Sequence, residues 1–324
     1  MFLRSNIQTV LGLIPKEKLG FCHSHEHLFI APGKSEKVNP ALRIDDLGRT
    51  VEELKMYKNL GGQSIVDAQP VGCGRMAEYL AESSEKAHVH IIASTGFHKM
   101  IFYDEDHWIK NINEDKLADI FIHELEKGMF TDGDYKAPEK AISSKAGIIK
   151  TASDSEGITD EYKKLFLAAA RASRCTGFCI LSHTEMGKHA LEQIELFVKE
   201  GVNPDSIIIC HLDRDLSDMG YHRAVAETGV FMEYDTIGRF KYHSDLEEAK
   251  FIVEMVESGF ENKILLGLDT TRERLLSYGG SIGLGYIKQK FIPLLLELGI
   301  TQEMIEKFTI INPSEALAKR SETV

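Results

Sequence analysis

The chain has 324 residues, 43% of them hydrophobic, and a formal net charge of −12 from 50 acidic and 38 basic residues. This length allows one large domain or two small ones, with a substantial core in either case. The acidic balance argues against a general nucleic-acid or acidic-membrane surface, where a basic footprint is expected, so any anion site must be local.

Cysteine usage and hydropathy favour a soluble, cytoplasmic protein. Five cysteines are spread along the chain without a CxxC pair, which is unlike a disulfide framework. The N-terminal segment lacks the pattern of a signal peptide, and no run of about 18 apolar residues predicts a membrane span. We therefore expect reduced thiols and no membrane partner.

The first apolar stretch, residues 20–27, carries His23, His25 and His27 at alternate positions. In a β-strand these imidazoles would project from one face, because successive side chains alternate. Histidines gathered on one face are typical of a metal site, since one ion can serve several imidazoles. A solvated His-rich loop is the more common alternative, so the remaining chain has to supply further ligands.

Strand-like and helix-like patterns alternate along the whole chain. Helical periodicity covers residues 45–60, 159–173, 188–199 and 246–258. The β-branched apolar runs are residues 20–27, 63–67, 90–95, 147–151, 178–183, 207–211, 230–235 and 264–269. Eight such units in about 250 residues predict a single-domain (β/α)8 TIM barrel over residues 1–324, with a short N-terminal extension of about residues 1–19. A doubly wound sheet is the alternative, but it usually has a Gly-rich turn after its first strand.

Several of the predicted strands end in an ionisable residue. These residues are His25, His27, Lys150, His183, His211 and Asp269. In a barrel the carboxyl ends of the strands meet on one face, so residues far apart in sequence converge there. Any one of them could simply face solvent or cap a helix. Lys150 is the most informative, because a lysine that ends a buried apolar run is costly unless its charge is removed or paired.

These residues lie in motifs that resemble the phosphotriesterase-like branch of the amidohydrolase superfamily, which includes lactonases. The motifs are His25-Glu26-His27, Gly-Ile-Ile-Lys ending at Lys150, Ser-His-Thr at His183, Cys-His-Leu-Asp at His211 and Gly-Leu-Asp at Asp269. The resemblance implies two divalent metal ions, zinc foremost, with manganese, cobalt or iron as alternatives. It places His25, His27 and Asp269 on one ion and His183 and His211 on the other. Lys150, carboxylated by CO2, would bridge both ions.

The resemblance also implies the reaction. A hydroxide bridging the two ions would open a lactone, and Asp269 would accept its proton. An organophosphate triester or an amide is the alternative substrate on the same centre, and a non-catalytic metal-binding module is a third hypothesis. Residues 95–98, Thr-Gly-Phe-His, lack the tyrosine that lactonases for acylated homoserine lactones carry after Thr-Gly-x. This difference disfavours an apolar-tailed lactone.

The loops after the seventh and eighth predicted strands, residues 236–243 and 270–274, concentrate cations in an otherwise acidic chain. Barrels frequently bind phosphate in these two loops, and arginine offers a bidentate fork for it. We therefore expect a phosphorylated sugar lactone as the small-molecule substrate. Its binding residues would be Lys241, Arg272, Tyr278, Arg239 and His98. The alternative is that these cations form surface salt bridges with Asp235, Asp245 or Glu273.

Two irregular segments and two other residues complete the predictions. Residues 97–115, with the only tryptophan, are expected to form a pocket wall or lid, or alternatively an interface or surface hairpin. Residues 278–285 are Gly-rich but lack the Lys-Ser/Thr ending of a P-loop, so we expect a mobile loop at the barrel mouth. His23 is expected to pack deeper in the barrel or beside the ligands, and Glu26 to face the helices. A homodimer is compatible with the resemblance.

Overall fold

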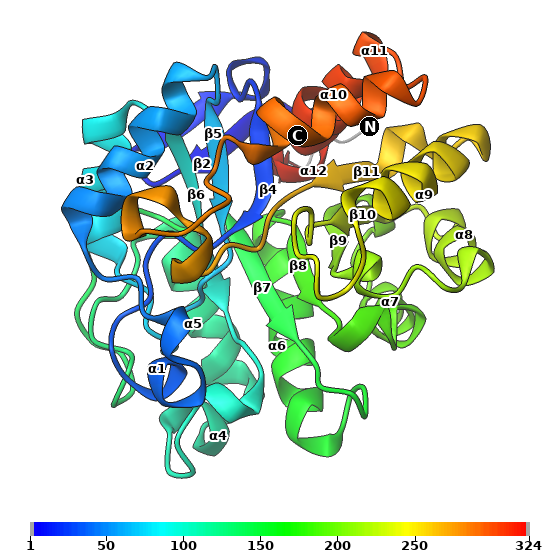
Figure 1. Ribbon diagram of the computed structural model, residues 1–324. Coiled ribbons are helices and arrows are strands. Elements are labelled where there is room, and N and C mark those ends of the chain that lie inside the picture. Colours follow the sequence, from blue (N-terminus) through cyan, green and yellow to red (C-terminus); the bar gives the residue numbers. More distant parts are fainter. Residues whose placement is uncertain (1–2, 322–324) are drawn as a thin grey trace.

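The computed structural model describes residues 3–321 and has a parallel eight-stranded sheet surrounded by helices (Figure 1). Each strand overlaps one predicted run, and neighbours in the sheet follow chain order, which confirms the (β/α)8 TIM barrel over the doubly wound alternative. The strands are β4 (Cys22–Glu26), β5 (Ser64–Asp67), β6 (His90–Gly96), β7 (Ile148–Ala152), β8 (Ile180–His183), β9 (Ile207–Cys210), β10 (Phe231–Tyr234) and β11 (Ile264–Leu266).

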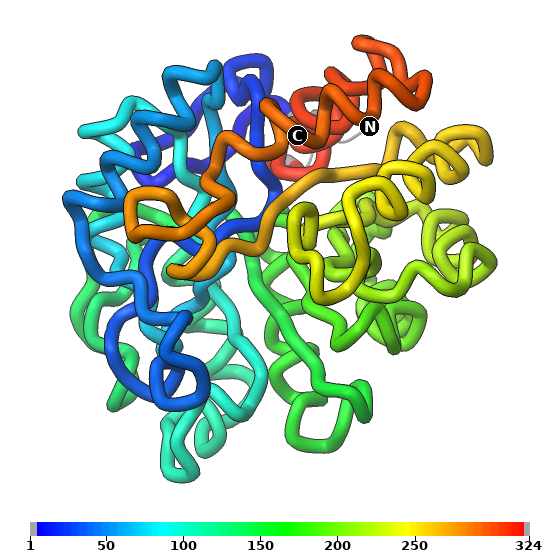
Figure 2. Tube along the Cα trace, viewed as in Figure 1, coloured from blue at the N-terminus to red at the C-terminus, as the bar shows by residue number. Residues whose placement is uncertain are grey.

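The barrel closes where the first and last of these strands meet. The hydroxyl of Ser24 donates to the carbonyl of Leu266 at 3.0 Å, and the amide of Asp269 donates to the carbonyl of His25 at 3.0 Å. In Figure 2 the blue trace of β4 accordingly runs beside the golden trace of β11. This closure brings the predicted ligands of the first barrel strand close to the predicted ligand that follows the last one.

The four predicted helices are α2 (Leu47–Asn59), α6 (Asp160–Thr176), α7 (Ala190–Lys199) and α9 (Asp245–Glu257). Polar caps define where they begin: Asp46 accepts the amide of Arg49 in α2, and Ser244 and Glu247 form a capping box in α9. The other helices are α1 (Lys34–Val38), α3 (Ala77–Ala87), α4 (Trp108–Asn111), α5 (Glu114–Glu126), α8 (Met219–Glu227), α10 (Ile292–Glu297), α11 (Gln302–Glu306) and α12 (Asn312–Leu317). No helix within residues 3–321 has the length and apolar character needed to cross a membrane.

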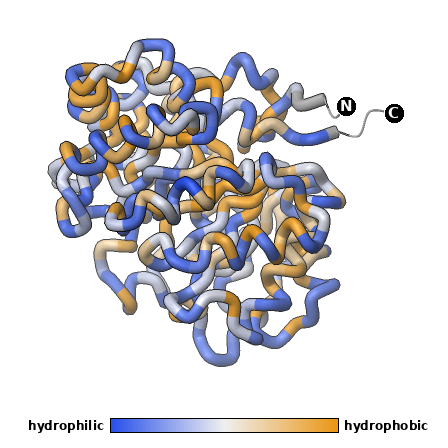
Figure 3. The backbone as a smooth tube through the Cα atoms, turned by 90° about the vertical axis from the view of Figure 1, so that its right-hand side faces the viewer, coloured by the Kyte–Doolittle hydropathy of each residue, from blue (hydrophilic) through white to orange (hydrophobic). Residues whose placement is uncertain are grey.

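Apolar side chains fill the barrel from within and separate it from the helices. Figure 3 shows hydrophobic segments concentrated inside the molecule. One buried residue from every strand lines the interior: Cys22, Val66, Ile92, Ile148, Leu181, Ile208, Phe231 and Leu265. This layer lies on the amino-terminal side of the strand ends, so it forms a solid floor beneath the polar residues that follow.

The N-terminal extension closes the amino-terminal end of the barrel. Strands β2 (Asn6–Thr9) and β3 (Gly12–Pro15) form an antiparallel hairpin, and Ile7 packs into the interior layer. Strand β1 (Leu3–Arg4) pairs with β12 (Arg320–Ser321), which joins the two ends of the described chain. The extension therefore stabilises the face opposite the predicted site.

The two irregular segments are both anchored. In residues 97–115 the indole of Trp108 is buried and donates to the carbonyl of Gly133 at 2.6 Å, which excludes a surface hairpin. Residues 278–285, whose mobility stays a prediction, are tied to α2 through the buried Glu53. Its carboxylate accepts the amides of Ser277 at 2.7 Å and Leu284 at 3.0 Å, so both ends of the segment are tied to α2.

A buried ion pair links the loop after β5 to α5 and gives a prediction about stability. Arg75 and Glu124 are both fully buried and form a bidentate pair, with one nitrogen–oxygen distance of 2.5 Å. Replacing Glu124 with glutamine should leave the guanidinium without its charge partner and lower the free energy of unfolding by about 3–5 kcal/mol, measured by urea denaturation. Glu82→Gln is the control, because its pair with Lys86 lies on the exposed face of α3 and should contribute little. Equal losses in the two variants would contradict this prediction.

Candidate metal and active site

The six predicted ligands converge at the carboxyl ends of the strands. His25 lies between two of the others: its Nε2 is 3.3 Å from Lys150 Nζ and 3.9 Å from an oxygen of Asp269. The same oxygen of Asp269 is 3.4 Å from His27 Nε2. Ring centroids are 4.8 Å apart for His25 and His211 and 4.4 Å apart for His183 and His211. The six predicted ligands, which lie on or directly after β4, β7, β8, β9 and β11, therefore form one contiguous cluster.

A β-bulge in β4 decides which histidines enter this cluster. The pairing of β4 with β5 shifts between His23 and Glu26, so one extra residue interrupts the alternation of faces. Cys22 consequently faces the interior, whereas His23 faces outward and packs edge-on against Tyr57 of α2, with centroids 4.8 Å apart. The expectation that three histidines share one face is wrong, and so is the placement of His23 deeper in the barrel. Only His25 and His27 point to the site.

His211 and Asp269 both follow a strand and adopt left-handed backbone conformations, with φ of 63° and 47°. Such conformations cost roughly 1–3 kcal/mol in non-glycine residues and persist where surrounding contacts impose them. Asp235 imposes this conformation on His211, because it accepts the His211 amide at 3.1 Å and pairs with the Nδ1 of the same residue at 2.7 Å. Gly267 leaves room for this packing, because an added Cβ would lie 3.1 Å from the Cβ atoms of both Asp235 and His25.

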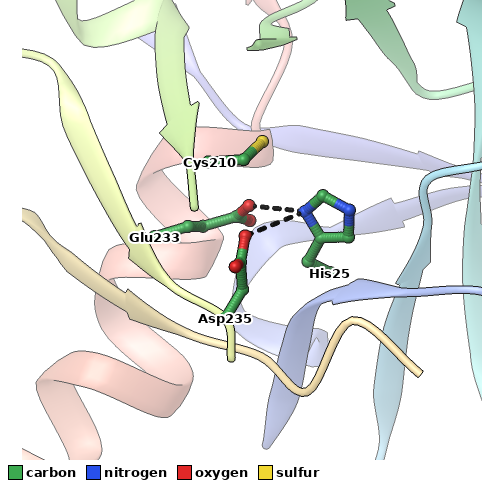
Figure 4. Close-up of side chains that lie close together, drawn as sticks. All are labelled: His25, Cys210, Glu233 and Asp235. Carbon is green, nitrogen blue, oxygen red and sulfur yellow. Dashed lines mark hydrogen bonds and ion pairs between the residues drawn. The ribbon is translucent and has the colours of Figure 1, made fainter. Parts of the chain in front are cut away.

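Two buried acids, one on β10 and one directly after it, were missed by the sequence predictions. Glu233 and Asp235 approach Nδ1 of His25 at 2.8 and 3.2 Å, and Figure 4 shows both carboxylates on one side of the ring. A proton held on Nδ1 leaves Nε2 free to bind a ligand, which is the usual arrangement around metal-binding histidines. The sequence does carry a pattern that indicates them, because acids at alternate positions of an apolar strand point to the same face. Asp235 was predicted only as a surface salt-bridge partner, and that alternative is wrong because it is fully buried.

Lys150 has the environment expected of a modified side chain. It is only 1% exposed, its Nζ faces the imidazole of His25 and the thiol of Cys210 at 3.8 Å, and it forms no ion pair within the described residues. A buried ammonium without a carboxylate partner is costly. Conversion to a carbamate would replace the cation with anionic oxygens, so the donor set fits divalent ions. Cys210 joins His25, Glu233 and Asp235 in a second buried group of potential ligands (Figure 4).

Two of the imidazoles are neutral near pH 7. Burial lowers the pKa of His183 to about 3, with further lowering from Arg214 and Lys150. Burial and Arg214 likewise hold the pKa of His211 well below its ordinary value. A neutral imidazole has the free electron pair that a metal ligand requires.

Two arginines bracket Asp269. Arg214 and Arg239 approach its Oδ2 at 2.8 and 3.2 Å. Burial acts to raise the pKa of Asp269, but Arg239, His27 and Arg214 together hold it well below its usual range. Arg239 was predicted as a substrate-binding residue, whereas here it pairs with Asp269. Arg214 was not predicted, because nothing in its local sequence distinguishes it from a surface cation.

The other predicted substrate-binding residues fall in two places. His98 lies beside the cluster, with its ring 5.6 Å from that of His183, so the start of the 97–115 segment forms a wall of the site. Lys241 is exposed over the ring of Tyr242 at 4.5 Å. Arg272 lies 5.9 Å from the ring of Tyr278.

Arg272 and Tyr278 line a cavity of about 350 Å³ beside Pro40. The hydroxyl of Tyr278 is already engaged, with its oxygen 2.9 Å from that of Thr50. Lys241 does not line this cavity and instead lies over the ring of Tyr242. Neither cation forms the predicted salt bridges within the described part of the chain, and Asp245 instead accepts the hydroxyl of Tyr286 at 2.7 Å.

A neighbouring acidic pair is a less suitable cation site. Asp213, His243 and Glu248 lie close enough together to share an ion. However, burial and the nearby Asp235 raise the pKa of Asp213 to about 7, and burial with Asp213 raises that of Glu248 well above its ordinary value. The same environment therefore favours the neutral form of both carboxyl groups, which binds a cation less well than the carboxylate of Asp269.

Comparisons with known proteins agree with this geometry. The sequence profile of the Phosphotriesterase family matches residues 5–317. A phospho-furanose lactonase of Mycoplasmopsis agalactiae is 35% identical over 324 residues, covering 96% of this chain and 91% of that protein. The crystal structure of an amidohydrolase from Mycoplasma synoviae aligns with a TM-score of 0.93 at 32% identity, covering 99% and 94% of the two chains. A lactonase from Listeria monocytogenes aligns with a TM-score of 0.90 at 31% identity, covering 98% and 100%. This chain therefore belongs to the phosphotriesterase family.

Proposed function

We propose that this protein is a metal-dependent lactonase that opens the ring of a phosphorylated sugar lactone. The observation that carries the proposal is the convergence of four imidazoles, Lys150 and Asp269 at the carboxyl end of the barrel. Membership of the family makes the chain a hydrolase of ester bonds. The relatives named phospho-furanose lactonases support the lactone and its phosphate.

The cofactors we propose are two divalent ions, with zinc foremost and manganese, cobalt or iron as alternatives. His25, His27 and Asp269 would hold one ion, His183 and His211 the other, and carboxylated Lys150 both. When bound, such ions lower the pKa of water from 15.7 to about 7 and polarise the carbonyl under attack. Imidazole and carboxylate ligands suit all of these metals, so the donor set does not select among them.

The side chains around the proposed metal ions have different roles in the reaction. Asp269 accepts the proton of the attacking water and passes it towards the leaving alkoxide. Arg214 and Arg239 keep this carboxylate ionised, since they hold its pKa low. Glu233 and Asp235 fix the tautomer and orientation of His25. His98, whose ring lies 5.6 Å from that of His183, would contact the substrate on that side of the site.

A matched pair of lactones tests the phosphate. We propose that Lys241, Arg272 and Tyr278 bind it at the mouth of the barrel. Hydrogen bonds to charged groups contribute about 1.5–3 kcal/mol each, so the loss of only one or two of them should lower kcat/KM by at least about 100-fold. Arg272→Ala should weaken hydrolysis of the phosphorylated lactone and leave the plain lactone unaffected.

Arg171→Ala is the control, because this half-exposed arginine pairs with Asp115 on the outer helices. Equal rates for the two lactones would exclude the phosphate hypothesis.

The same purified protein is to be assayed with an organophosphate triester and an amide. Turnover of either, without any lactone hydrolysis, would replace the lactonase assignment. The homodimer stays a prediction that light scattering can check.

A further inference from the structure

Glu26, the middle residue of the His-Glu-His motif, contacts the backbone on both sides of Asp269. Its carboxylate is fully buried. One oxygen accepts the amide of Leu268 at 3.1 Å, and the other accepts the amide of Thr270 at 3.2 Å. Leu268 and Thr270 are the immediate neighbours of Asp269. A single carboxylate thus holds one backbone amide just before this residue and one just after it.

Asp269 needs such support because of its backbone. Its φ of 47° lies in the left-handed region, which a non-glycine residue adopts only when its surroundings impose it. The other left-handed residue of the cluster, His211, is held by Asp235 through its own amide. Glu26 and Asp235 therefore have comparable roles at two strand ends. Each stabilises a residue, Asp269 or His211, whose backbone conformation is otherwise unfavourable.

His23 completes the arrangement from the helix side of β4. Its Nδ1 lies 2.8 Å from the oxygen of Glu26 that accepts the Leu268 amide, and its ring packs against Tyr57. The bulge in β4 allows this, because it puts His23 and Glu26 on the outer face together while His25 and His27 point inward. Both faces of the motif therefore reach Asp269. On the inner face His25 and His27 lie beside its carboxylate, and on the outer face Glu26 accepts the neighbouring backbone amides.

We infer that Glu26 is a positioning residue that holds Asp269 in the conformation needed to bind metal and accept a proton, and that His23 orients Glu26. The inference rests on the proposed function for its catalytic consequence. Its consequence for metal binding requires only that Asp269 is a ligand. The His-Glu-His motif would then supply two ligands directly and position a third from the opposite end of the chain.

Glu26→Gln in the full-length protein is the main test. Glutamine has the same shape, but its one carbonyl oxygen can accept only one of the two amides, and its NH2 group would face the other donor. We expect zinc affinity, measured by competition with a chelator, to fall about 10- to 100-fold. With the phosphorylated lactone, kcat per zinc-loaded protein should fall by a similar factor while KM changes little.

Glu53→Gln is a matched control. Glu53 is likewise buried and accepts two backbone amides, but these belong to Ser277 and Leu284 rather than to the neighbours of Asp269. A purely structural effect would appear in both variants as lower thermal stability, whereas only Glu26→Gln should weaken zinc binding. Equal zinc affinities in the two variants would overturn the inference.

His23→Phe provides a second route should Glu26→Gln fail to fold. Phenylalanine keeps the ring against Tyr57 but removes the donor to Glu26, so zinc affinity should fall in the same direction by a smaller factor. Unchanged zinc affinity in this variant would count against the inference. If the wild-type protein hydrolyses no lactone, the proposed function fails, yet the zinc comparison between Glu26→Gln and Glu53→Gln still decides the positioning role.

Discussion

Replacing Lys150 with alanine is expected to lower kcat by more than about 100-fold, the loss associated with a misplacement of about 1 Å among reacting groups. The substitution removes the one side chain proposed to contact both ions, so metal analysis should also show less zinc bound per chain. Lys150 is buried within the cluster, with its Nζ 3.3 Å from Nε2 of His25, so alanine would leave a gap where the proposed carbamate oxygens would lie. Steady-state kinetics and metal content measured on the same preparation test both consequences.

Lys163→Ala is the control, since Lys163 is exposed on α6 and should leave activity and metal content unchanged. The carbamate has a separate test. Metal-free protein should regain activity with zinc faster when bicarbonate is added than in CO2-depleted buffer. A Lys150→Ala variant with full activity and a full complement of metal would contradict the proposed bridging role.

Asp269→Asn is expected to lower kcat by about 10²–10⁴-fold, the range associated with loss of a general acid–base group. Asparagine preserves the shape of the side chain but cannot accept the proton. It also leaves Arg214 and Arg239 without the carboxylate that they contact. Raising the pH cannot rescue the variant, because the amide of asparagine does not ionise. In the wild type, by contrast, these arginines hold the pKa of the Asp269 carboxyl well below its usual range.

The measurement is kcat as a function of pH for wild type and variant on the same lactone. Asp119→Asn, which changes an exposed carboxylate on α5, should match the wild type throughout. Retention of wild-type kcat by Asp269→Asn would show that another group accepts the proton. Glu233 and Asp235 would then be the next residues to test, because they are the nearest other buried acids of the cluster.

The two substitutions separate different roles. Lys150→Ala should reduce the metal content and activity together. Asp269→Asn should reduce activity even in the fraction of protein that retains metal, because proton transfer is lost in addition to a ligand. A comparison of kcat per bound zinc in the two variants therefore distinguishes assembly of the site from the chemical step.

The sequence by itself determined the barrel and the set of residues that converge in it. Alternation of apolar strands with helical periods requires a parallel sheet, and the ends of parallel strands share one face. Lys150 could be identified because a lysine in a buried strand conflicts with its surroundings. Glu233 and Asp235 carried the same signal, because acids at alternate positions of a buried apolar run also conflict with their surroundings.

The tertiary structure decided the contacts that depend on register and on long-range pairing. The bulge in β4 turned His23 outward, which no alternation rule could anticipate because one extra residue reverses every later face. Arg214 and Glu26 acquired their roles from partners that follow β11 and are distant in sequence, 55 residues away for Arg214 and 242 and 244 residues away for Glu26. Local sequence defines which groups a strand carries, but barrel closure decides which of them meet.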